Sequence, residues 1–322
     1  MPTGTRNSSH LSWRSILHSV IAALPSLRSR EKTRLPWASL IESYTTVPEV
    51  YTDFFDPLRT AGRDFPYTVL TPAYENFIYP TTEKLISDLG NEIYVLERSG
   101  NTFTSLCYPT QGIIYVERGT MLLDSWLKIC GLTGQDGLKT TTLKFNTVTD
   151  FLFAPILKCI RFASVSDNDA VLSSELKKFD HLSHVNYKFM NYAKRSLLGD
   201  EKVIQTFLQP EIRKAKLPFL GKSYNRTISP THITILTDQE LIVIREDENW
   251  RDQTRYGGIW DFIPLNKIVS LNYSEKGEDL LELSIHLTEG ACLNFLNQTS
   301  TKPEIERLIA QLNKLALIQV DK

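Results

Sequence analysis

The stretch ITILTDQELIVIRE, residues 233–246, consists of two short apolar runs on either side of Thr-Asp-Gln. Runs of this length that are rich in β-branched residues and separated by a turn predict a β-hairpin. An earlier stretch, EKLISDLGNEIYVLER (83–98), aligns without a gap with THITILTDQELIVIRE (231–246), so that Glu92 meets Glu240 and Val95 meets Val243. Few residues are identical, but the runs and turns have the same spacing. The chain is therefore predicted to contain one structural unit twice.

The remainder of each half follows one order of elements, short strands and then a helix. In the first half, strands are predicted at 67–70, 84–89, 92–97, 102–108, 113–117, 122–130 and 140–145, before a helix at 149–162. Pro155 either kinks that helix or marks its first turn. In the second half, strands are predicted at 203–208, 231–236, 240–245, 258–263, 268–273, 280–286 and 291–296, before a helix at 303–317. YPTQGIIYV (108–116) also parallels IPLNKIVSL (263–271), and TLKFN (142–146) parallels CLNFL (292–296).

Three motifs of the second half resemble the bacterial pleckstrin-homology-like (PH-like) fold. They are GDEKV (199–203), similar to the acidic-to-basic step that opens such domains, ILTDQELI (235–242), similar to their first hairpin with its Thr at the turn, and IPLNKI (263–268), similar to their IPLxxI step. This resemblance covers residues 200–318, and the first half shares it only through the internal repeat. It implies a mainly β protein with α, in which two PH-like domains, each of about seven antiparallel strands and a C-terminal helix, are joined by a helical linker.

The predicted organisation has four parts. Residues 1–46 form an N-terminal extension, amphipathic or disordered, in which apolar residues of 13–27 recur at helical spacing among basic ones. Such a segment could lie at a membrane interface or pack on the body. Residues 47–163 form the first PH-like domain, 164–199 a linker with one helix at 174–198, and 200–322 the second PH-like domain.

Composition narrows the classes of partner. The chain has 322 residues, 42% of them hydrophobic, and a formal net charge of −1, so it exerts no overall attraction on nucleic acid or on an anionic membrane. The longest early apolar run, residues 16–24, is far shorter than the about 20 residues that span a bilayer, and no signal peptide is predicted. The cysteines, Cys107, Cys130, Cys159 and Cys292, lack CxxC spacing, which predicts reduced thiols in a cytoplasmic protein, with a peripheral position at the membrane as the alternative.

Motifs of known chemistry are missing from the sequence. It contains no GxSxG, GxxxxGK, GxGxxG or HExxH. His181 and His184 share one face of the predicted linker helix, but no third metal ligand is near, and His232 and His286 fall inside strands. We therefore predict no catalytic residue, cofactor or metal. An enzyme, a hydrolase with a site at the domain interface, is the alternative.

One basic stretch is a candidate anion- or membrane-binding site. Residues 212–237 contain no carboxylate and five cations, Arg213, Lys214, Lys216, Lys222 and Arg226. The stretch is predicted to connect the first two strands of the second domain, and the PH-like resemblance implies that such a loop holds phosphorylated lipid headgroups. The family's Lys-x-Arg signature is not matched, because the second strand reads HITI (232–235). A solvated loop, or one docked on an acidic surface of the first domain, is the alternative.

These observations predict a non-catalytic binding or scaffold module. It is expected to dock to a protein partner or, at the periphery, to an anionic membrane surface. No nucleic-acid partner is expected, and the sequence leaves the oligomeric state open.

Overall fold

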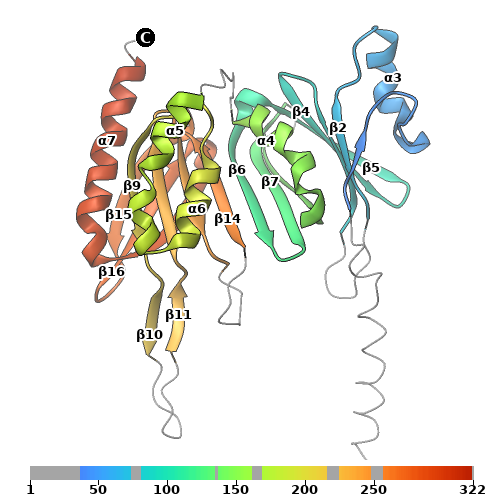
Figure 1. Ribbon diagram of the computed structural model, residues 1–322. Helices are drawn as coiled ribbons and strands as arrows, with labels where there is room; N and C mark the ends of the chain where they lie inside the picture. Colours follow the sequence, from blue (N-terminus) through green and yellow to red (C-terminus); the bar gives the residue numbers. More distant parts are fainter. Residues whose placement is uncertain are drawn as a thin grey trace, which may run out of the picture.

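A computed structural model describes residues 37–73, 81–134, 137–161, 169–215, 225–247 and 257–320. The described chain is mainly β, and its paired strands are antiparallel, as predicted (Figure 1). It forms a five-stranded, a seven-stranded, a three-stranded and a two-stranded sheet. Within these residues no helix has the length and apolar character needed to cross a membrane.

The first half contributes the five-stranded sheet and three strands of the seven-stranded one. The five-stranded sheet has the order β1 (Ser39–Ile41), β2 (Tyr67–Thr71), β3 (Glu83–Asp88), β4 (Glu92–Ser99) and β5 (Thr102–Pro109). The short helices η2 (Glu49–Tyr51) and α3 (Thr52–Thr60) connect β1 with β2. After η3 (Thr110–Gly112) follow β6 (Ile113–Met121), β7 (Asp124–Thr133), β8 (Gly137–Asn146), η4 (Thr147–Phe153) and α4 (Ala154–Ile160). Pro155 lies in the first turn of α4 and therefore starts this helix rather than kinking it.

The predicted N-terminal extension, 1–46, is too long at its C-terminal end. Its residues 1–36 lie outside the described ones, but β1 pairs with β2, with Leu40 opposite Val69. Ala38 and Ile41 are buried. The folded part of the first half therefore begins before residue 47, because these apolar side chains belong to its core.

The second half completes the seven-stranded sheet. It contributes β9 (Val203–Gln209), β12 (His232–Thr237), β13 (Glu240–Arg245) and β14 (Gly258–Pro264), and the full order is β8-β7-β6-β14-β13-β12-β9. After η6 (Leu265–Lys267), the three-stranded sheet consists of β15 (Ile268–Glu275), β16 (Leu280–Leu287) and β17 (Cys292–Gln298), with η7 (Thr288–Gly290) before β17. The chain ends in η8 (Thr299–Thr301) and α7 (Lys302–Val320). The pair β6–β14, which we call the seam, joins strands of the two halves into one sheet.

The two aligned stretches of sequence form hairpins of identical register. Asp88 is opposite Ile93 in the first hairpin, and Leu236 is opposite Leu241 in the second, at positions that the gap-free alignment places together. Pro109 and Pro264 likewise lie opposite Glu92 and Glu240. Each proline is followed by a short 3₁₀ turn and by a strand whose pairing is irregular after its first residue.

The predicted linker helix, 174–198, is not continuous. The segment contains α5 (Asp169–Lys177), η5 (Asp180–His184) and α6 (Tyr187–Ser196). A new helix starts at α6 because Asn186 has an extended backbone and its side chain accepts a hydrogen bond from the Phe189 N–H. His181 and His184 lie in η5 and are exposed, and no cluster of metal-ligating side chains occurs among the described residues.

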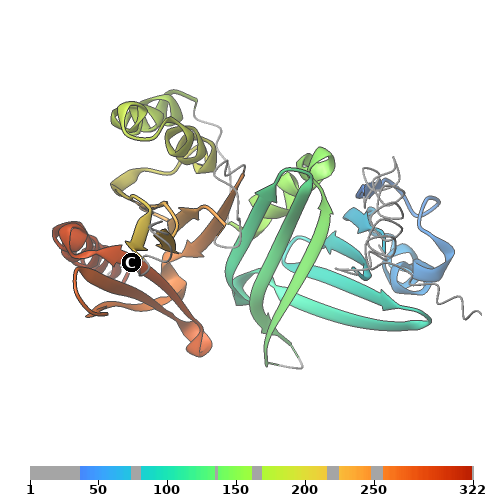
Figure 2. The same cartoon turned by 90° about the horizontal axis from the view of Figure 1, so that it is seen from below.

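The second-half strands of the seven-stranded sheet are covered on both faces. In Figure 2, α5 and α6 lie on one side of these strands, and the three-stranded sheet with α7 lies on the other. On the α6 side one buried cluster includes Val116 of β6, Ile156 of α4 and Ile242 of β13, so the core is continuous across the seam. On the α7 side Leu308 and Leu312 are buried in a cluster with residues of the second-half sheets.

Candidate functional site

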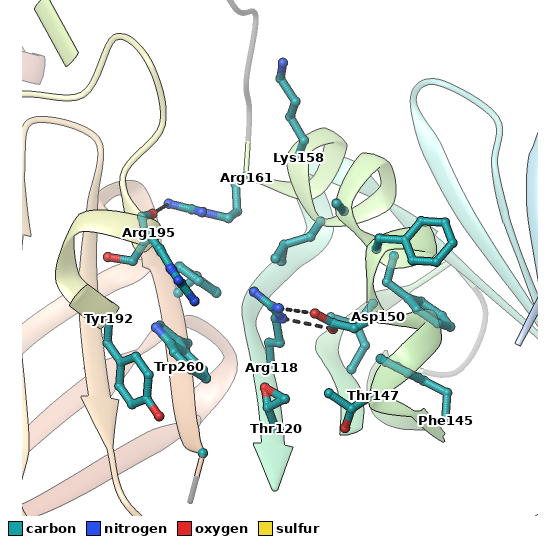
Figure 3. A pocket seen from close by; sticks show the side chains of 18 of the residues that line it. Arg118, Thr120, Phe145, Thr147, Asp150, Lys158, Arg161, Tyr192, Arg195 and Trp260 are labelled. Carbon is teal, nitrogen blue, oxygen red and sulfur yellow. Dashed lines mark hydrogen bonds and ion pairs between the residues drawn. The ribbon is translucent and has the colours of Figure 1, made fainter. Parts of the chain in front are cut away.

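A cleft of about 800 Å³ lies above the seam. Strands β6 and β14 form its floor, η4 and α4 form one wall, and α6 forms the other (Figure 3). The floor side chains come from alternate strand positions, since Arg118 and Thr120 face the cleft from β6 and Trp260 and Phe262 face it from β14. Both halves of the chain therefore contribute to one cavity.

Aromatic side chains pack around the second-half side of the floor. Arg118 and Trp260 are opposite each other across the seam, and the Arg118 guanidinium carbon lies 5.6 Å from the centre of the Trp260 ring. The Tyr192 ring of α6 packs on Trp260 with ring centres 4.8 Å apart. Gly258 makes this approach possible, because a Cβ atom there would lie 2.9 Å from Cε2 of Tyr192. Trp260 is thus fixed between a cation and a second ring.

The floor is linked to the first wall by an ion pair. The Arg118 Nε donates to Oδ1 of Asp150 at 3.1 Å, and its Nη2 donates to Oδ2 of the same carboxylate. Asp150 belongs to η4, so this two-point contact joins β6 to the wall. A bidentate pair fixes the plane of the guanidinium as well as its position. Arg118 is therefore held in one orientation above Trp260.

Arg161 connects the end of α4 with the second half. Its Nε donates to both carboxylate oxygens of Glu240, at 3.1 and 3.3 Å, and its Nη2 donates to the Ser196 carbonyl oxygen at 2.7 Å. The guanidinium also lies 3.5 Å from Oε2 of Glu201 and stacks over Phe262. The side chains of Arg161, Glu201 and Glu240 are all buried.

The surroundings of Glu201 favour its protonated form. Burial, and next the negative charge of Glu240, raise the pKa of Glu201 to about 8. Glu201 also hydrogen-bonds Glu240 and accepts a hydrogen bond from the Leu198 N–H at 2.7 Å. Protonation of Glu201 removes one negative charge from this buried group, which is favourable because a buried charge without full compensation is costly.

The remaining cations of the cleft stand on opposite walls. Arg195 is exposed in the last turn of α6, and Lys158 is exposed on α4. Arg118, Lys158, Arg161 and Arg195 line the cleft, whereas Asp150 is the sole carboxylate among its described lining residues. Two of these cations are compensated within the protein, because Asp150 pairs with Arg118 and Glu240 pairs with Arg161.

One rim of the cleft is apolar and exposed. Val148 and Phe151 of η4 have exposed fractions of 54% and 68%, and their spacing of three places them on one face of a 3₁₀ helix. Leu122 and Leu123, at the β6–β7 turn, are 54% and 47% exposed. The turn adjoins η4, because the Thr147 N–H donates to the Leu123 carbonyl oxygen at 3.0 Å. We call these four side chains the rim patch.

The described part of the cleft has no arrangement of groups that is typical of catalysis. Its described lining residues include no histidine or cysteine, and Asp150 is committed to Arg118. Among the lining hydroxyl groups, that of Ser196 donates to the Ala193 carbonyl oxygen at 2.8 Å. A nucleophile beside a general base is therefore not found in the part of the cleft that the structure describes.

A second network lies on the opposite face of the seam. Glu117 of β6 accepts from Trp126 Nε1 at 2.7 Å and contacts Lys128 Nζ at 2.9 Å and Arg245 Nη2 at 3.0 Å. Asp261 of β14 contacts Arg245 Nε at 3.3 Å. Burial raises the pKa of Asp261 to about 6, and the charge of Glu117 adds to this while Arg245 opposes it. The seam thus carries charged groups on both faces.

The basic stretch predicted from the sequence forms a separate hairpin. Strands β10 (Ile212–Ala215) and β11 (Asn225–Ser229) connect β9 with β12, and Lys214 is opposite Arg226. Arg213, Lys214 and Arg226 are exposed, whereas Lys216 and Lys222 lie outside the described residues. Arg213 forms an ion pair with Glu211, which precedes the carboxylate-free stretch by one residue. None of these three described cations lines the cleft.

The sequence did not single out the cleft residues. Arg118, Asp150, Arg195 and Trp260 come from four different elements, and no local motif joins them. The usable signal was weak, namely charged residues in the middle of two strands that are otherwise mostly apolar, Glu117 and Arg118 in β6 and Asp261 in β14. The pairing of those strands was not predicted.

Comparison with known proteins gives no functional lead. No protein-family model matches the chain, and no curated protein shows significant similarity to it. The geometry of the cleft and of the basic hairpin therefore carries the functional argument.

Proposed function

We propose that the protein is a non-catalytic docking module of the PH-like type, in which two such units share the seven-stranded sheet and a protein partner binds in the cleft between them. The order of elements supports two units. Strands β2 to β5, then β6 to β8, then α4 form one series, and β9 with β12 to β14, then β15 to β17, then α7 form the other. The matching registers of the two hairpins support the same interpretation.

The observation that carries the docking function is the cleft above the seam. It combines a rigid floor, made by Arg118, Asp150 and Trp260, with exposed cations on both walls and an exposed apolar rim. Fixed polar groups beside apolar surface are the features by which binding sites gain affinity and orientation. A hydrolase would need a nucleophile and a base in the same place, and the described lining residues do not supply them.

The basic hairpin supports a second candidate, docking on an anionic membrane. In Figure 1, β10 and β11 project beyond the strands that they connect. Lys214 and Arg226 are cross-strand neighbours, an arrangement that is unfavourable unless an anion compensates it. Each cation near an anionic leaflet contributes about 1 kcal/mol, so the described part of the hairpin supports weak, salt-sensitive binding only.

The test compares two charge reversals. Arg195→Glu changes the cleft, and Arg59→Glu is the matched control, because Arg59 is also an exposed arginine in the last turn of a helix, α3, away from the cleft. Wild type and the two variants are used to capture proteins of the native host. We select the proteins that wild type and Arg59→Glu retain but Arg195→Glu does not. These proteins are purified, and their binding is measured by calorimetry.

Saturable binding of such a protein, weakened by Arg195→Glu alone, is the expected result. If every retained protein binds Arg195→Glu as tightly as wild type, the cleft is not the docking site. Binding to anionic vesicles that depends on Lys214 and Arg226, without any protein that distinguishes the two variants, would favour the membrane candidate instead.

A further inference from the structure

We infer that copies of this chain associate head to tail, with the free edge of β5 in one copy pairing with the free edge of β15 in the next. This inference goes beyond the proposed docking function and does not depend on it. It starts from the seam, in which β14 of the second half pairs with β6 of the first half. The chain contains a counterpart of each of these two strands, and both counterparts are outermost in their sheets in the part of the chain that the structure describes.

The registers of the two halves identify the counterparts. Pro109 ends β5 opposite Glu92, and Pro264 ends β14 opposite Glu240, so β5 is the first-half counterpart of β14. Strand β15 is the second-half counterpart of β6, because each follows a short 3₁₀ turn and each has pairing that is irregular after its first residue. A contact between β5 and β15 would therefore repeat the contact between β14 and β6.

Burial distinguishes the seam strands from their counterparts. The first six residues of β14 and the first five of β6 are buried. By contrast, the first four residues of β5 are exposed, and so are four of the eight residues of β15. Among the described residues no further strand pairs with β5 beyond β4 or with β15 beyond β16, so one side of each presents unpaired backbone groups. The exposure thus occurs where a second seam contact is missing.

Neither edge has the usual protection against pairing with another molecule. Natural edge strands are commonly protected by lysine and other charged side chains, or by proline within the strand. TFTSLCYP (102–109) contains no charged residue, and its proline is the last residue. IVSLNYSE (268–275) contains one charged residue, Glu275, at its end. Because every copy of the chain carries both edges, a second copy is the partner that fits them.

The space beside β15 also lacks the neighbour that the cleft has. A groove of about 310 Å³ lies between β15 and α7, and it is lined by Val269 and Leu271 of the strand and by Ile309 and Leu312 of the helix. The cleft likewise has β6 and α4 on one side, but β14 and α6 form its other side. Strand β5 of a second copy would flank the groove as β14 flanks the cleft.

The seam also predicts the register of the new contact. Ile259 of β14 lies opposite Gly119 of β6. Counted from the matching prolines and from the first residues of β6 and β15, their counterparts are Thr104 in β5 and Ser274 in β15. Both side chains are exposed and uncharged. Thr104 of one copy should therefore lie opposite Ser274 of the next.

The contact joins two different surfaces, so the association is heterologous. Each pair of copies in contact leaves one β5 edge and one β15 edge free. Assembly therefore continues beyond two copies, either as an open chain or until a ring closes. A symmetric dimer, by contrast, would stop at two copies.

The experiment measures sedimentation velocity of the full chain over a series of concentrations. Two double variants are compared with wild type. The like-charge variant carries Thr104→Lys and Ser274→Lys, and the opposite-charge variant carries Thr104→Lys and Ser274→Glu. They are matched, because both change the same two exposed positions, and melting curves check that both are folded.

Wild type should sediment faster as its concentration rises and should form species larger than a dimer. The like-charge variant should associate about tenfold or more weakly than the opposite-charge variant, because like charges that face each other across two strands repel. A third variant, Thr104→Glu with Ser274→Glu, should associate weakly alone and should associate with the like-charge variant when the two are mixed.

A change in the backbone tests the same edge without charge. The Thr110 N–H donates to the Asn91 carbonyl oxygen at 2.8 Å, and bonded and non-bonded pairs alternate along an antiparallel ladder. The backbone groups of Ser105 therefore point away from β4, toward the free edge. Ser105→Pro removes a donor from that edge but leaves the hydrogen bonds to β4, so it should weaken association.

Three results would overturn the inference. They are a wild-type chain that stays monomeric at every concentration, a dimer as the largest species, and equal association of the like-charge and opposite-charge variants. Association of Ser105→Pro that equals that of wild type would likewise exclude the β5 edge.

Discussion

Glu117 of β6 lies directly opposite Asp261 of β14, so two carboxylates face each other across the seam between the halves of the chain. Both are buried, and they share Arg245, whose Nη2 contacts Glu117 and whose Nε contacts Asp261. Burial of Asp261 raises its pKa to about 6, and the negative charge of Glu117 adds to this effect while Arg245 opposes it. The stability of the seam is therefore expected to depend on pH.

Asp261→Asn should reduce that dependence. The folded-state pKa of Asp261 lies above the value of about 3.9 for an unfolded chain, so its contribution to stability is fully present below that value and is lost as the pH rises through about 6. Relative to the variant, wild type should lose on the order of 1 to 3 kcal/mol of unfolding free energy between pH 4 and pH 7. Urea unfolding at several pH values measures this difference. Parallel curves for the two proteins would refute the assignment.

Glu201→Gln should show a pH dependence of stability with the same sign. Relative to this variant, wild type should again lose unfolding free energy as the pH rises, but over a higher range of pH. The pKa of Glu201 is about 8 in the folded state against about 4.3 unfolded, so the stabilising effect of its proton is lost as the pH rises through about 8. Between these two pKa values, the unfolding free energy of wild type should fall by up to about 1.4 kcal/mol per pH unit relative to the variant. Glu278→Gln is the control, because Glu278 is exposed in the turn before β16 and should follow wild type at every pH. A constant difference between wild type and Glu201→Gln would contradict the proposed proton on Glu201.

Gly257→Ala should disrupt the seam. Gly257 has φ +92° and a Cβ atom there would lie 1.8 Å from the carbonyl oxygen of Thr120 in β6. Gly277→Ala is the matched control, because Gly277 also has a positive φ, +104°, but no atom within 4 Å of the added Cβ. The control should cost about 1 kcal/mol from backbone strain, and Gly257→Ala should cost more, because the backbone of β6 must move. Equal unfolding free energies would show that the close approach is not required.

Reversal of the hairpin charges should remove weak binding to anionic vesicles. Lys214→Glu together with Arg226→Glu changes two exposed cations that lie opposite each other. At about 1 kcal/mol each, their loss corresponds to roughly thirtyfold in affinity at low salt. Sedimentation with anionic and neutral vesicles measures this, with Arg59→Glu as the control. If wild type ignores anionic vesicles at low salt, the hairpin has another role.

The hairpins and the terminal helix could be predicted because their signals are local. The two apolar runs of 231–246 determine both strands and their turn, and Ile305, Leu308 and Leu312 recur at helical spacing on the buried face of α7. The break before α6 was missed, because the helical spacing of apolar residues continues past Asn186 while the side chain of Asn186 starts a new helix.

The cleft could not be predicted because it depends on a pairing between distant strands. The apolar character of β6 indicates burial on both faces, but it does not identify β14 as the neighbour. Without that pairing, Arg118 and Trp260 have no reason to meet, and the partners of Arg161 in the second half stay unknown. The sequence instead drew attention to the basic hairpin, where the cations are adjacent along the chain.

Amide hydrogen exchange of the full chain, with and without the partner isolated through its dependence on Arg195, tests docking in the cleft most directly. Binding there should slow exchange in η4, at the β6–β7 turn and in the last turn of α6, because these segments form the walls and the rim. Exchange in β10, β11 and α7 should not change. Slower exchange confined to the β10–β11 hairpin or to α7, with η4 and α6 unaffected, would contradict docking in the cleft.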